Sequence, residues 1–300
     1  MRRLGLCLLA AAALSLAPRA HAFCRTTTCD PNAASQRCER DDNDCVLTGK
    51  PLAWQSSCVT VGVHQLGSPK HGFSYDDVAG VVEQAFDEWM SADCGGKGPS
   101  LDVRLIGPVE CGLSEYNSEA GNANIVLFRE DDWPYIGAAN AIGITTTRFD
   151  RKTGALWDAD IELNAVGQNL SIGDPIEGDD LLSVLTHEAG HFLGLSHSLD
   201  REATMRAVYD PSRDGTSFRS LADDDVAGIC EIYPPDRKPS TKSCDNRHGF
   251  SGQCGADQPP RDESSGCSLN TRAGSGHAHF AALALLTALG ARLARRRRVV

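Results

Sequence analysis

The sequence predicts an α+β domain with a mixed twisted sheet and three main helices. Two observations predict it: short apolar stretches with strand-like patterning, and longer segments in which apolar residues recur at helical spacing. Helices are interspersed among the strands, which is an α+β order. The expected strands lie at 59–64, 101–106 and 125–128, and in a hairpin formed by 141–149 and 156–164.

Three segments have the spacing of amphipathic helices. The first begins after Ser74, whose hydroxyl is placed to cap its first turn. The second is expected at 179–193 and the third at 221–233. The apolar positions of the first helix are Val78, Val81, Val82, Ala85, Phe86 and Trp89.

Residues 1–22 have the features of a secretory signal. Two arginines precede an apolar run, and Ala20-His21-Ala22 supplies a small-x-small cleavage site, so the mature chain is expected to begin near Phe23. The alternative is a membrane anchor, but the run is short for a membrane span.

The remaining chain divides by composition. Residues 23–48 are polar and cysteine-rich and predict a disulfide-pinned arm. Residues 49–236 carry the strong periodicity and have the size of one domain. Residues 237–267 are rich in Pro, Gly, Ser and charge, which indicates a linker, and 268–300 form a tail.

The tail has three parts in a fixed order. Cys267 is followed by an apolar stretch at 273–291 without Asp, Glu, Lys or Arg, and then by an arginine cluster at 295–298. The stretch is long enough to cross a membrane, with the arginines on the cytoplasmic side. A buried C-terminal helix is the alternative. The order resembles the MYXO-CTERM class of bacterial sorting tails, which implies that Cys267 is a processing point and that the protein is surface-anchored or released.

Cysteine count and charge agree with export. Of the 12 cysteines, Cys7 lies in the signal and Cys267 in the tail, which leaves an even number for disulfides, with Cys94 and Cys111 as a plausible local pair. Nine arginines lie in the two ends, which contain no acid, so the net charge of −11 becomes −20 for residues 23–267. This acidity disfavours nucleic-acid binding and suits calcium.

Residues His187 to His197 have the spacing of a metal site. On a helix, His187 and His191 lie about 40° apart around the axis and can reach one ion. Gly194 can end the helix in the left-handed conformation and return His197 toward them. Three neutral imidazoles and a water would make an open zinc site, in which Glu188 is placed to take a proton from that water.

Two other interpretations compete with an open zinc site. The histidines could serve packing, but apolar residues lie on the opposite face of the helix, which leaves the histidines facing a cleft. A closed structural zinc would need a fourth protein ligand, and the neighbouring sequence offers none.

The motif His187-Glu188-x-x-His191-x-x-Gly194-x-x-His197, followed by a methionine, resembles the metzincin metalloproteases, and most closely the matrixins. Ser198 follows the third histidine, and Met205 lies at the matrixin interval. The resemblance extends over about 52–234, because 86–89 fits the family's first helix and 221–229 the opening of its last.

The resemblance implies a zincin fold, one catalytic zinc held by the three histidines, and hydrolysis of protein or peptide substrates with Glu188 as general base. It places Met205 as a floor below the zinc, and Val208 and Tyr209 at the substrate pocket. Two further residues, Asp224 and Asp225, would anchor the last helix to the methionine turn.

Three departures from the matrixin pattern matter. Arg206 and Ala207 replace the Tyr-Pro that commonly follows the methionine, which alters the pocket wall. The hairpin lacks the histidines that bind a second zinc, so one zinc is expected; Asp158 and Asp160 could help bind calcium or could be solvated. The matrixin pro-segment, which blocks the zinc with a cysteine, has no counterpart here, unless one of the early cysteines blocks the zinc.

Two functions from other classes remain. A zinc-containing surface binding or adhesion module without turnover would also suit an acidic, disulfide-tied body, but it gives no reason for Glu188. A purely structural exported protein would hold no stoichiometric metal.

Overall fold

The computed structural model describes residues 22–33, 35–253 and 298–299. The predicted signal up to residue 21, Cys267 and the predicted apolar stretch at 273–291 lie outside this part of the chain. Among the described residues, no helix has the length and apolarity needed to cross a membrane.

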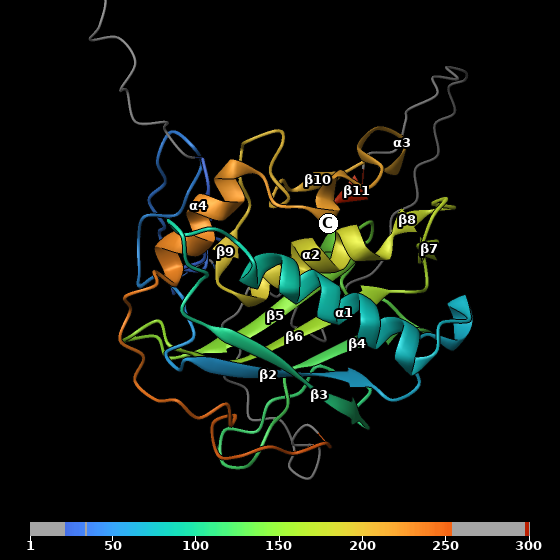
Figure 1. Ribbon diagram of the computed structural model, residues 1–300, viewed down its shortest axis with the longest axis horizontal. Coiled ribbons are helices and arrows are strands. Elements are labelled where there is room, and N and C mark those ends of the chain that lie inside the picture. The colour runs from blue at the N-terminus through green and yellow to red at the C-terminus, as the bar shows by residue number, and fades with distance from the viewer. Residues whose placement is uncertain (1–21, 34, 254–297, 300) are drawn as a thin grey trace, which may run out of the picture.

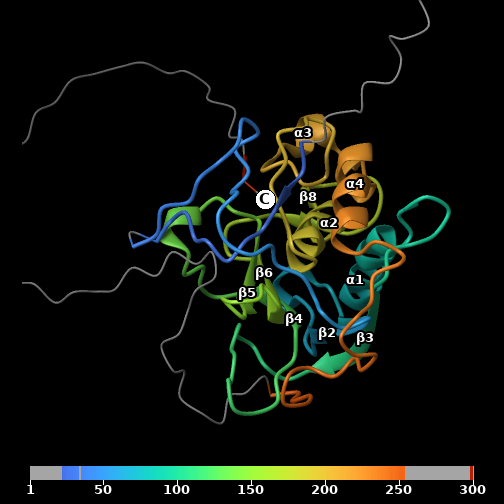
Figure 2. The same cartoon turned by 90° about the vertical axis from the view of Figure 1, so that its left-hand side faces the viewer.

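A five-stranded mixed sheet forms the centre of the fold, in the order β3-β2-β4-β6-β5. β2, β3, β4 and β6 run parallel, and β5 pairs antiparallel with β6 at one edge. Figure 2 shows the strands in this order, with β5 and β3 at opposite edges. The strands are β2 (Cys58–His64), β3 (Asp102–Val109), β4 (Ile125–Arg129), β5 (Gly143–Phe149) and β6 (Leu156–Asn164).

The two longest helices lie on one face of this sheet (Figure 1). α1 (Tyr75–Met90) begins at Ser74, whose hydroxyl accepts from the Asp77 amide in a capping box, as the sequence predicts. α2 (Leu181–Phe192) packs beside α1 and against β5. α4 (Asp223–Ile232) follows near the C-terminal end of the domain, and α3 (Pro211–Asp214) is a single turn.

Short elements complete the domain. They are β1 (Cys24–Arg25), β7 (Leu170–Ser171), β8 (Asp179–Asp180), β9 (Leu195–Ser196), β10 (Val208–Tyr209) and β11 (Arg298–Val299), with one-turn 3-10 helices at Pro69–His71, Ile136–Ala138 and Ser217–Arg219. β1 pairs with β9, and β10 pairs antiparallel with β11. The α+β class and its main elements are confirmed, with ends that move by a few residues.

Both faces of the sheet are buried at its central strand β4. Val126 and Phe128 of β4 belong to the main core between the sheet and the helices, whereas Ile125 and Leu127 belong to a smaller cluster on the other face. Alternate side chains of a strand point to opposite faces, so β4 has to be apolar at nearly every position.

Part of the predicted linker packs against the domain. Residues 237–253 run along the side of the sheet away from α1 and α2, in orange in Figure 1. The disulfide Cys58–Cys244 ties this strap to the first residue of β2, and backbone bridges join Thr241 to Ser56 and Phe250 to Asn122. Its polar composition does not prevent docking, because the backbone bridges and the disulfide are joined by polar side-chain contacts, such as the hydrogen bond from Thr60 to Asn246.

Disulfides also differ in part from the sequence expectation. Cys94 pairs with Cys230 of α4, so the proposed pair with Cys111 is wrong; Cys111 is disulfide-bonded elsewhere. The chain after α1 folds back on the end of α4, where the amide of Ser100 donates to the carbonyl of Tyr233. The pairs Cys24–Cys45 and Cys29–Cys38 pin the N-terminal arm.

Candidate metal centre

α2 carries the first two histidines at a fixed place above the sheet. Its N-terminus is capped by Asp180, whose carboxylate accepts from the amide and the hydroxyl of Ser183. Beyond its C-terminus, Gly194 has a φ of 100°, and a Cβ there would lie 2.6 Å from the carbonyl oxygen of Leu52. Glycine is therefore needed at the turn that leads into β9 and returns His197 to the helix.

The structure brings His187, His191 and His197 together. Their candidate ligand atoms all lie within 4.8 Å of one another, and the Nε2 atoms of His191 and His197 are 3.2 Å apart. Two nitrogens bound to one tetrahedral zinc would be separated by about 3.3 Å, given zinc to nitrogen bonds of about 2.0 Å. The triad therefore fits a zinc ion.

Backbone carbonyls fix the orientation of two of these rings. Nδ1 of His187 lies 2.7 Å from the carbonyl oxygen of Thr204, and Nδ1 of His191 lies 3.0 Å from that of Leu195. A carbonyl only accepts, so each Nδ1 carries the proton and each Nε2 keeps its lone pair for a metal.

Burial keeps His187 neutral. The ring is fully buried, and burial, with the neighbouring His191 and His197, lowers its pKa well below the ordinary histidine value. Its Nε2 has no hydrogen-bond partner among the residues that the structure describes. A buried acceptor without a partner is costly, and a metal ion at this position would satisfy it.

Glu188 projects from α2 toward β5. One carboxylate oxygen, Oε2, accepts a hydrogen bond of 2.6 Å from the hydroxyl of Thr145, whereas Oε1 is buried and has no partner within the described part of the chain. Burial raises the pKa of Glu188 to about 7, although the bond from Thr145 acts to lower it. Sequence reasoning missed Thr145, because only the hairpin register shows that it faces the helix.

Met205 lies directly below α2. It is fully buried, and a Cβ on Gly190 would come within 2.2 Å of its sulfur. The amides of Thr204 and Met205 both donate to the carboxylate of Asp225 in α4, at 2.7 and 3.0 Å. The segment that supports His187 is thereby held by α4.

Of the two predicted pocket residues, Tyr209 is connected to the triad through Phe218. Tyr209 is buried, and its hydroxyl donates to the carbonyl of Gly215 at 2.7 Å. Sequence reasoning missed Phe218, whose ring lies 5.4 Å from that of Tyr209 and 6.3 Å from that of His187. The guanidinium of Arg206 lies over Phe218 and pairs with Asp214 at 2.7 Å. Val208 pairs with Val299 in β10 and β11.

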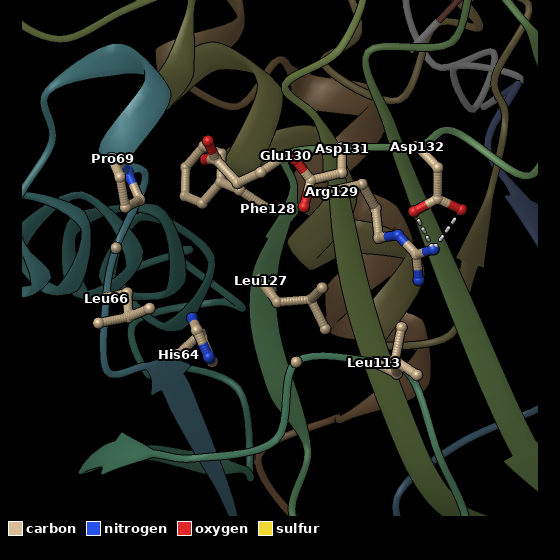
Figure 3. Close-up of a pocket in the computed structure, with 12 residues that line it drawn as sticks. His64, Leu66, Pro69, Leu113, Leu127, Phe128, Arg129, Glu130, Asp131 and Asp132 are labelled. Carbon is tan, nitrogen blue, oxygen red and sulfur yellow. Dashed lines mark hydrogen bonds and ion pairs between the residues drawn. The ribbon is translucent and has the colours of Figure 1, made fainter.

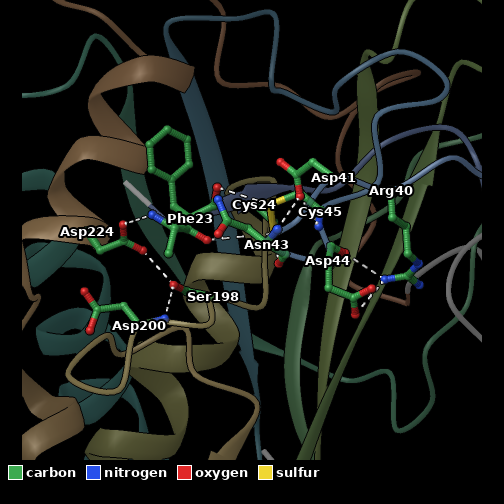
Figure 4. Close-up of a disulfide and its surroundings, with 11 residues drawn as sticks. Phe23, Cys24, Arg40, Asp41, Asn43, Asp44, Cys45, Ser198, Asp200 and Asp224 are labelled. Atoms are coloured by element: carbon green, nitrogen blue, oxygen red, sulfur yellow. Dashed lines mark hydrogen bonds and ion pairs between the residues drawn. A yellow bond between two sulfur atoms is a disulfide. The ribbon is translucent and has the colours of Figure 1, made fainter. Parts of the chain in front are cut away.

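The N-terminal arm holds the chain before His197, and α4 holds it after His197. Figure 4 shows the disulfide Cys24–Cys45 of the arm and the contact of Asp224 with Ser198. β1 pairs with β9, the two residues before His197, and the disulfide Cys24–Cys45 starts from β1. The carboxylate of Asp224 accepts from the hydroxyl of Ser198 at 2.6 Å, and from the amide of Ala22, the residue directly before the arm, also at 2.6 Å. These contacts connect the arm, α4 and the last histidine.

A separate cavity of about 270 Å³ opens where β2 and β4 end, and it contains none of the predicted site residues. Figure 3 shows Leu66 and Leu113 at its sides and Arg129 bonded to Asp132 on its border. The metal-ligating groups therefore belong to a different part of the molecule.

Comparison with known proteins agrees with this geometry. Residues 122–234 match the model of the matrixin family, Peptidase_M10. Matrix metalloproteinase-16 of Homo sapiens is 44% identical over 200 residues, which cover 64% of this chain and 29% of that protein. Metalloendoproteinase 1-MMP of Arabidopsis thaliana is 30% identical over 195 residues, which cover 64% of this chain and 47% of that protein.

A further relative is Matrix metalloproteinase-C of Caenorhabditis elegans, 26% identical over 207 residues that cover 63% of this chain and 31% of that protein. The chain thus spans less than half the length of these relatives. The matched segment includes the helix with His187, Glu188 and His191, the turn to His197, and Met205. Within this chain, residues 122–234 are therefore similar to the matrixin family.

Proposed function

We propose that the chain is a zinc-dependent endopeptidase that hydrolyses protein or peptide substrates. One observation carries the proposal: two buried acceptor atoms, Nε2 of His187 and Oε1 of the adjacent Glu188, have no partner among the described residues, and His187 lies next to two further imidazoles. Such a set is suited to a metal ion and a water molecule that Glu188 can deprotonate. The matrixin match supports it.

His187, His191 and His197 would hold the zinc ion. Bound zinc would polarise the scissile carbonyl and lower the pKa of water toward neutrality. The bonds from Nδ1 of His187 and His191 to backbone carbonyls keep both rings neutral and oriented. Met205 supports the helix from below, and Asp225 fixes the segment that contacts His187.

Glu188 moves the proton. Its free oxygen, Oε1, accepts a proton from the attacking water, and the same oxygen then donates it to the nitrogen of the leaving amine. The other oxygen remains bonded to Thr145 throughout. The side chain thus acts first as a general base and then as a general acid.

A substrate would lie along β5. This strand forms one edge of the sheet and contacts α2, so its outer side is available for pairing with an extended peptide. A substrate that pairs with β5 on both sides of the scissile bond can be cleaved in the interior of its chain, as an endopeptidase requires. Val208 and Tyr209 would contact the side chain that follows the scissile bond.

A quenched peptide library tests the function. Zinc-loaded protein should cleave peptides internally, and a chelator should abolish cleavage until zinc is restored. Glu188→Ala should bind zinc as the wild type does and lose at least about a hundredfold in kcat. Cleavage that survives both treatments would refute the mechanism.

A zinc-containing binding or adhesion module is the second candidate. The acidic body and its disulfides suit this function equally well. It predicts bound zinc without turnover, whereas a structural protein predicts no stoichiometric zinc. Elemental analysis of the purified protein, combined with the library, distinguishes the three functions.

Export is part of the proposal, with the protein anchored at the cell surface or released after processing. Disulfides in the arm and between distant elements support an oxidising compartment. The signal at 1–22 and the sorting tail that starts at Cys267 are proposed from their sequence patterns. Fractionation of cells, with mass spectrometry of both ends of the mature protein and of Cys267→Ala, tests each part.

Calcium is proposed as a further ion on the outer face of the sheet. Asp158 and Asp160 project side by side from β6 and are almost fully buried. Oδ1 of Asp158 and the hydroxyl of Thr146, a residue that pairs with Asp160, are buried without a partner among the described residues. Oxygen ligands of this kind suit calcium.

A further inference from the structure

Two residues of the edge strand β5 contact the carboxylate of Glu188. The hydroxyl of Thr145 lies 2.6 Å from Oε2 and 3.1 Å from the backbone oxygen of the same glutamate. A Cβ built on Gly143 would lie 2.7 Å from Oε1. Both positions face α2, because their partners in β6, Ile161 and Leu163, belong to the core under the helices.

We propose that Thr145 is a positioning residue for Glu188: its hydroxyl holds Oε2, the space at Gly143 admits Oε1, and Oε1 is thereby the oxygen that exchanges the proton. This inference rests on the proposed peptidase function. It adds two residues outside the metal-binding motif to the proton-transfer apparatus.

The hydrogen bond distinguishes the two carboxylate oxygens. A threonine hydroxyl has one hydrogen, and both neighbouring atoms of Glu188 are acceptors, so Thr145 donates to the glutamate. A glutamate side chain otherwise turns freely about its terminal bond, which would exchange its oxygens. Fixing one of them keeps the other directed at the proton that it transfers, and proton transfer is sensitive to that geometry.

The contact joins two elements that are held independently. β5 pairs with β6 along its whole length, from Gly143 to Phe149. α2 is capped by Asp180 and packs on α1. The position of the hydroxyl relative to the carboxylate is therefore set by the packing of helix on sheet, which suits a group that orients another.

Gly143 is the second half of the arrangement. An added methyl group would also lie 2.9 Å from Cγ and 3.0 Å from Cδ of Glu188, which is closer than carbon atoms approach without a shift. The atoms in its way are the far end of a side chain, so the carboxylate would move and the backbone would stay. Gly143→Ala therefore displaces Glu188 while the Thr145 hydroxyl remains.

The kinetic test uses zinc-loaded full-length protein and one peptide from the library. Thr145→Val removes the hydroxyl at nearly constant shape and is expected to lower kcat by about tenfold or more, with KM changed less than about twofold. Thr145→Ser keeps the hydroxyl and should retain kcat within about threefold. Gly143→Ala should also lower kcat more than it raises KM.

Thr147→Val is the matched control. Thr147 lies two residues along the same strand, on the same face and opposite Ala159, and no hydrogen bond joins it to Glu188. It should leave kcat unchanged. Equal losses in Thr145→Val and Thr147→Val would mean that the effect is on the strand alone and would overturn the proposal.

A second readout needs no activity. In metal-free protein, the denaturation midpoints of Thr145→Val, Glu188→Ala and the double variant should be non-additive, because both single changes break the same hydrogen bond. Additive midpoints would overturn the proposal. If the wild type cleaves nothing, the proposed function fails; if it cleaves and Thr145→Val keeps full kcat, this inference alone fails.

Discussion

Asp225 and Thr204 are joined by a hydrogen bond of 2.7 Å, from the Thr204 amide to a carboxylate oxygen. The carbonyl of the same Thr204 accepts from Nδ1 of His187, also at 2.7 Å. Asp225 additionally accepts from the amides of Met205 and Ala222. The peptide unit between Thr204 and Met205 therefore connects α4 to His187 of the candidate metal centre.

Asp225→Asn should weaken zinc binding. The asparagine amide group would present donor hydrogens to amides that are themselves donors, so Thr204 would shift and release His187. Loss of a group that orients a metal ligand costs about tenfold to a hundredfold in affinity. Competition with a zinc-binding dye measures this loss.

Asp223→Asn is the control for the loss of charge, because Asp223 is exposed and lies in the same first turn of α4. It should bind zinc as the wild type does. Equal affinities in Asp225→Asn and the wild type would show that His187 does not depend on this connection.

The disulfide Cys24–Cys45 should stabilise the position of His197. It starts from β1, which pairs with the residues just before His197. Replacing both cysteines with serine should lower the free energy of unfolding by about 2–4 kcal/mol and weaken zinc binding. The melting temperature and a zinc titration report the two effects.

The Cys29–Cys38 pair offers a comparison within the same arm. It closes a loop that does not include β1. Its removal should affect stability but leave zinc affinity unchanged. If removal of Cys29–Cys38 changed zinc affinity as much as removal of Cys24–Cys45, a specific connection from β1 to His197 would be ruled out.

Local patterns predict the helix that carries His187 and His191 well. Each signal depends only on residues that are close in the sequence. These signals are the helical periodicity, the spacing of His187 and His191, and the glycine at 194. The cap of α1 at Ser74 is local in the same sense. These features need no knowledge of the tertiary fold, which is why the sequence was sufficient for them.

Contacts that depend on tertiary packing were not predictable in this way. Thr145 reaches Glu188 only because β5 has its particular register beside α2. Phe218 reaches His187 from the 3-10 helix Ser217–Arg219 between α3 and α4, and Cys94 meets Cys230 across 136 residues. No spacing within a short stretch of sequence carries that information.

Phe218→Ala should open space beside the metal centre. The ring fills the volume between Tyr209 and His187 and is 2% exposed. Its removal should cost about 3 kcal/mol of stability and let the zinc-loaded protein accept larger side chains after the scissile bond. Denaturation and the peptide library measure the two changes.

Phe218→Leu, which keeps most of the volume, should show the wild-type preference. An unchanged cleavage profile in Phe218→Ala would mean that this ring does not border the substrate. Reduced stability alone would indicate a purely packing role.

Asp158 should make the stability of calcium-free protein depend on pH. Burial raises its pKa to about 7, and the neighbouring Arg148 only partly offsets this. Because the unfolded value is about 3.9, the folded state binds the extra proton between these two values, and the free energy of unfolding falls as pH rises through this window. Asp158→Asn should reduce the slope by up to about 1.4 kcal/mol per pH unit.

Denaturation at about pH 4.5 and about pH 7.5, without calcium, measures this slope. At the higher pH, added calcium should raise the melting temperature of the wild type, because the ion neutralises the carboxylate charge of the buried Asp158. Asp158→Asn should lose this response, and the exposed Asp131→Asn should keep it. A calcium response that survives in Asp158→Asn would place the ion elsewhere. An identical pH slope in the wild type and Asp158→Asn would show that the fold does not desolvate Asp158.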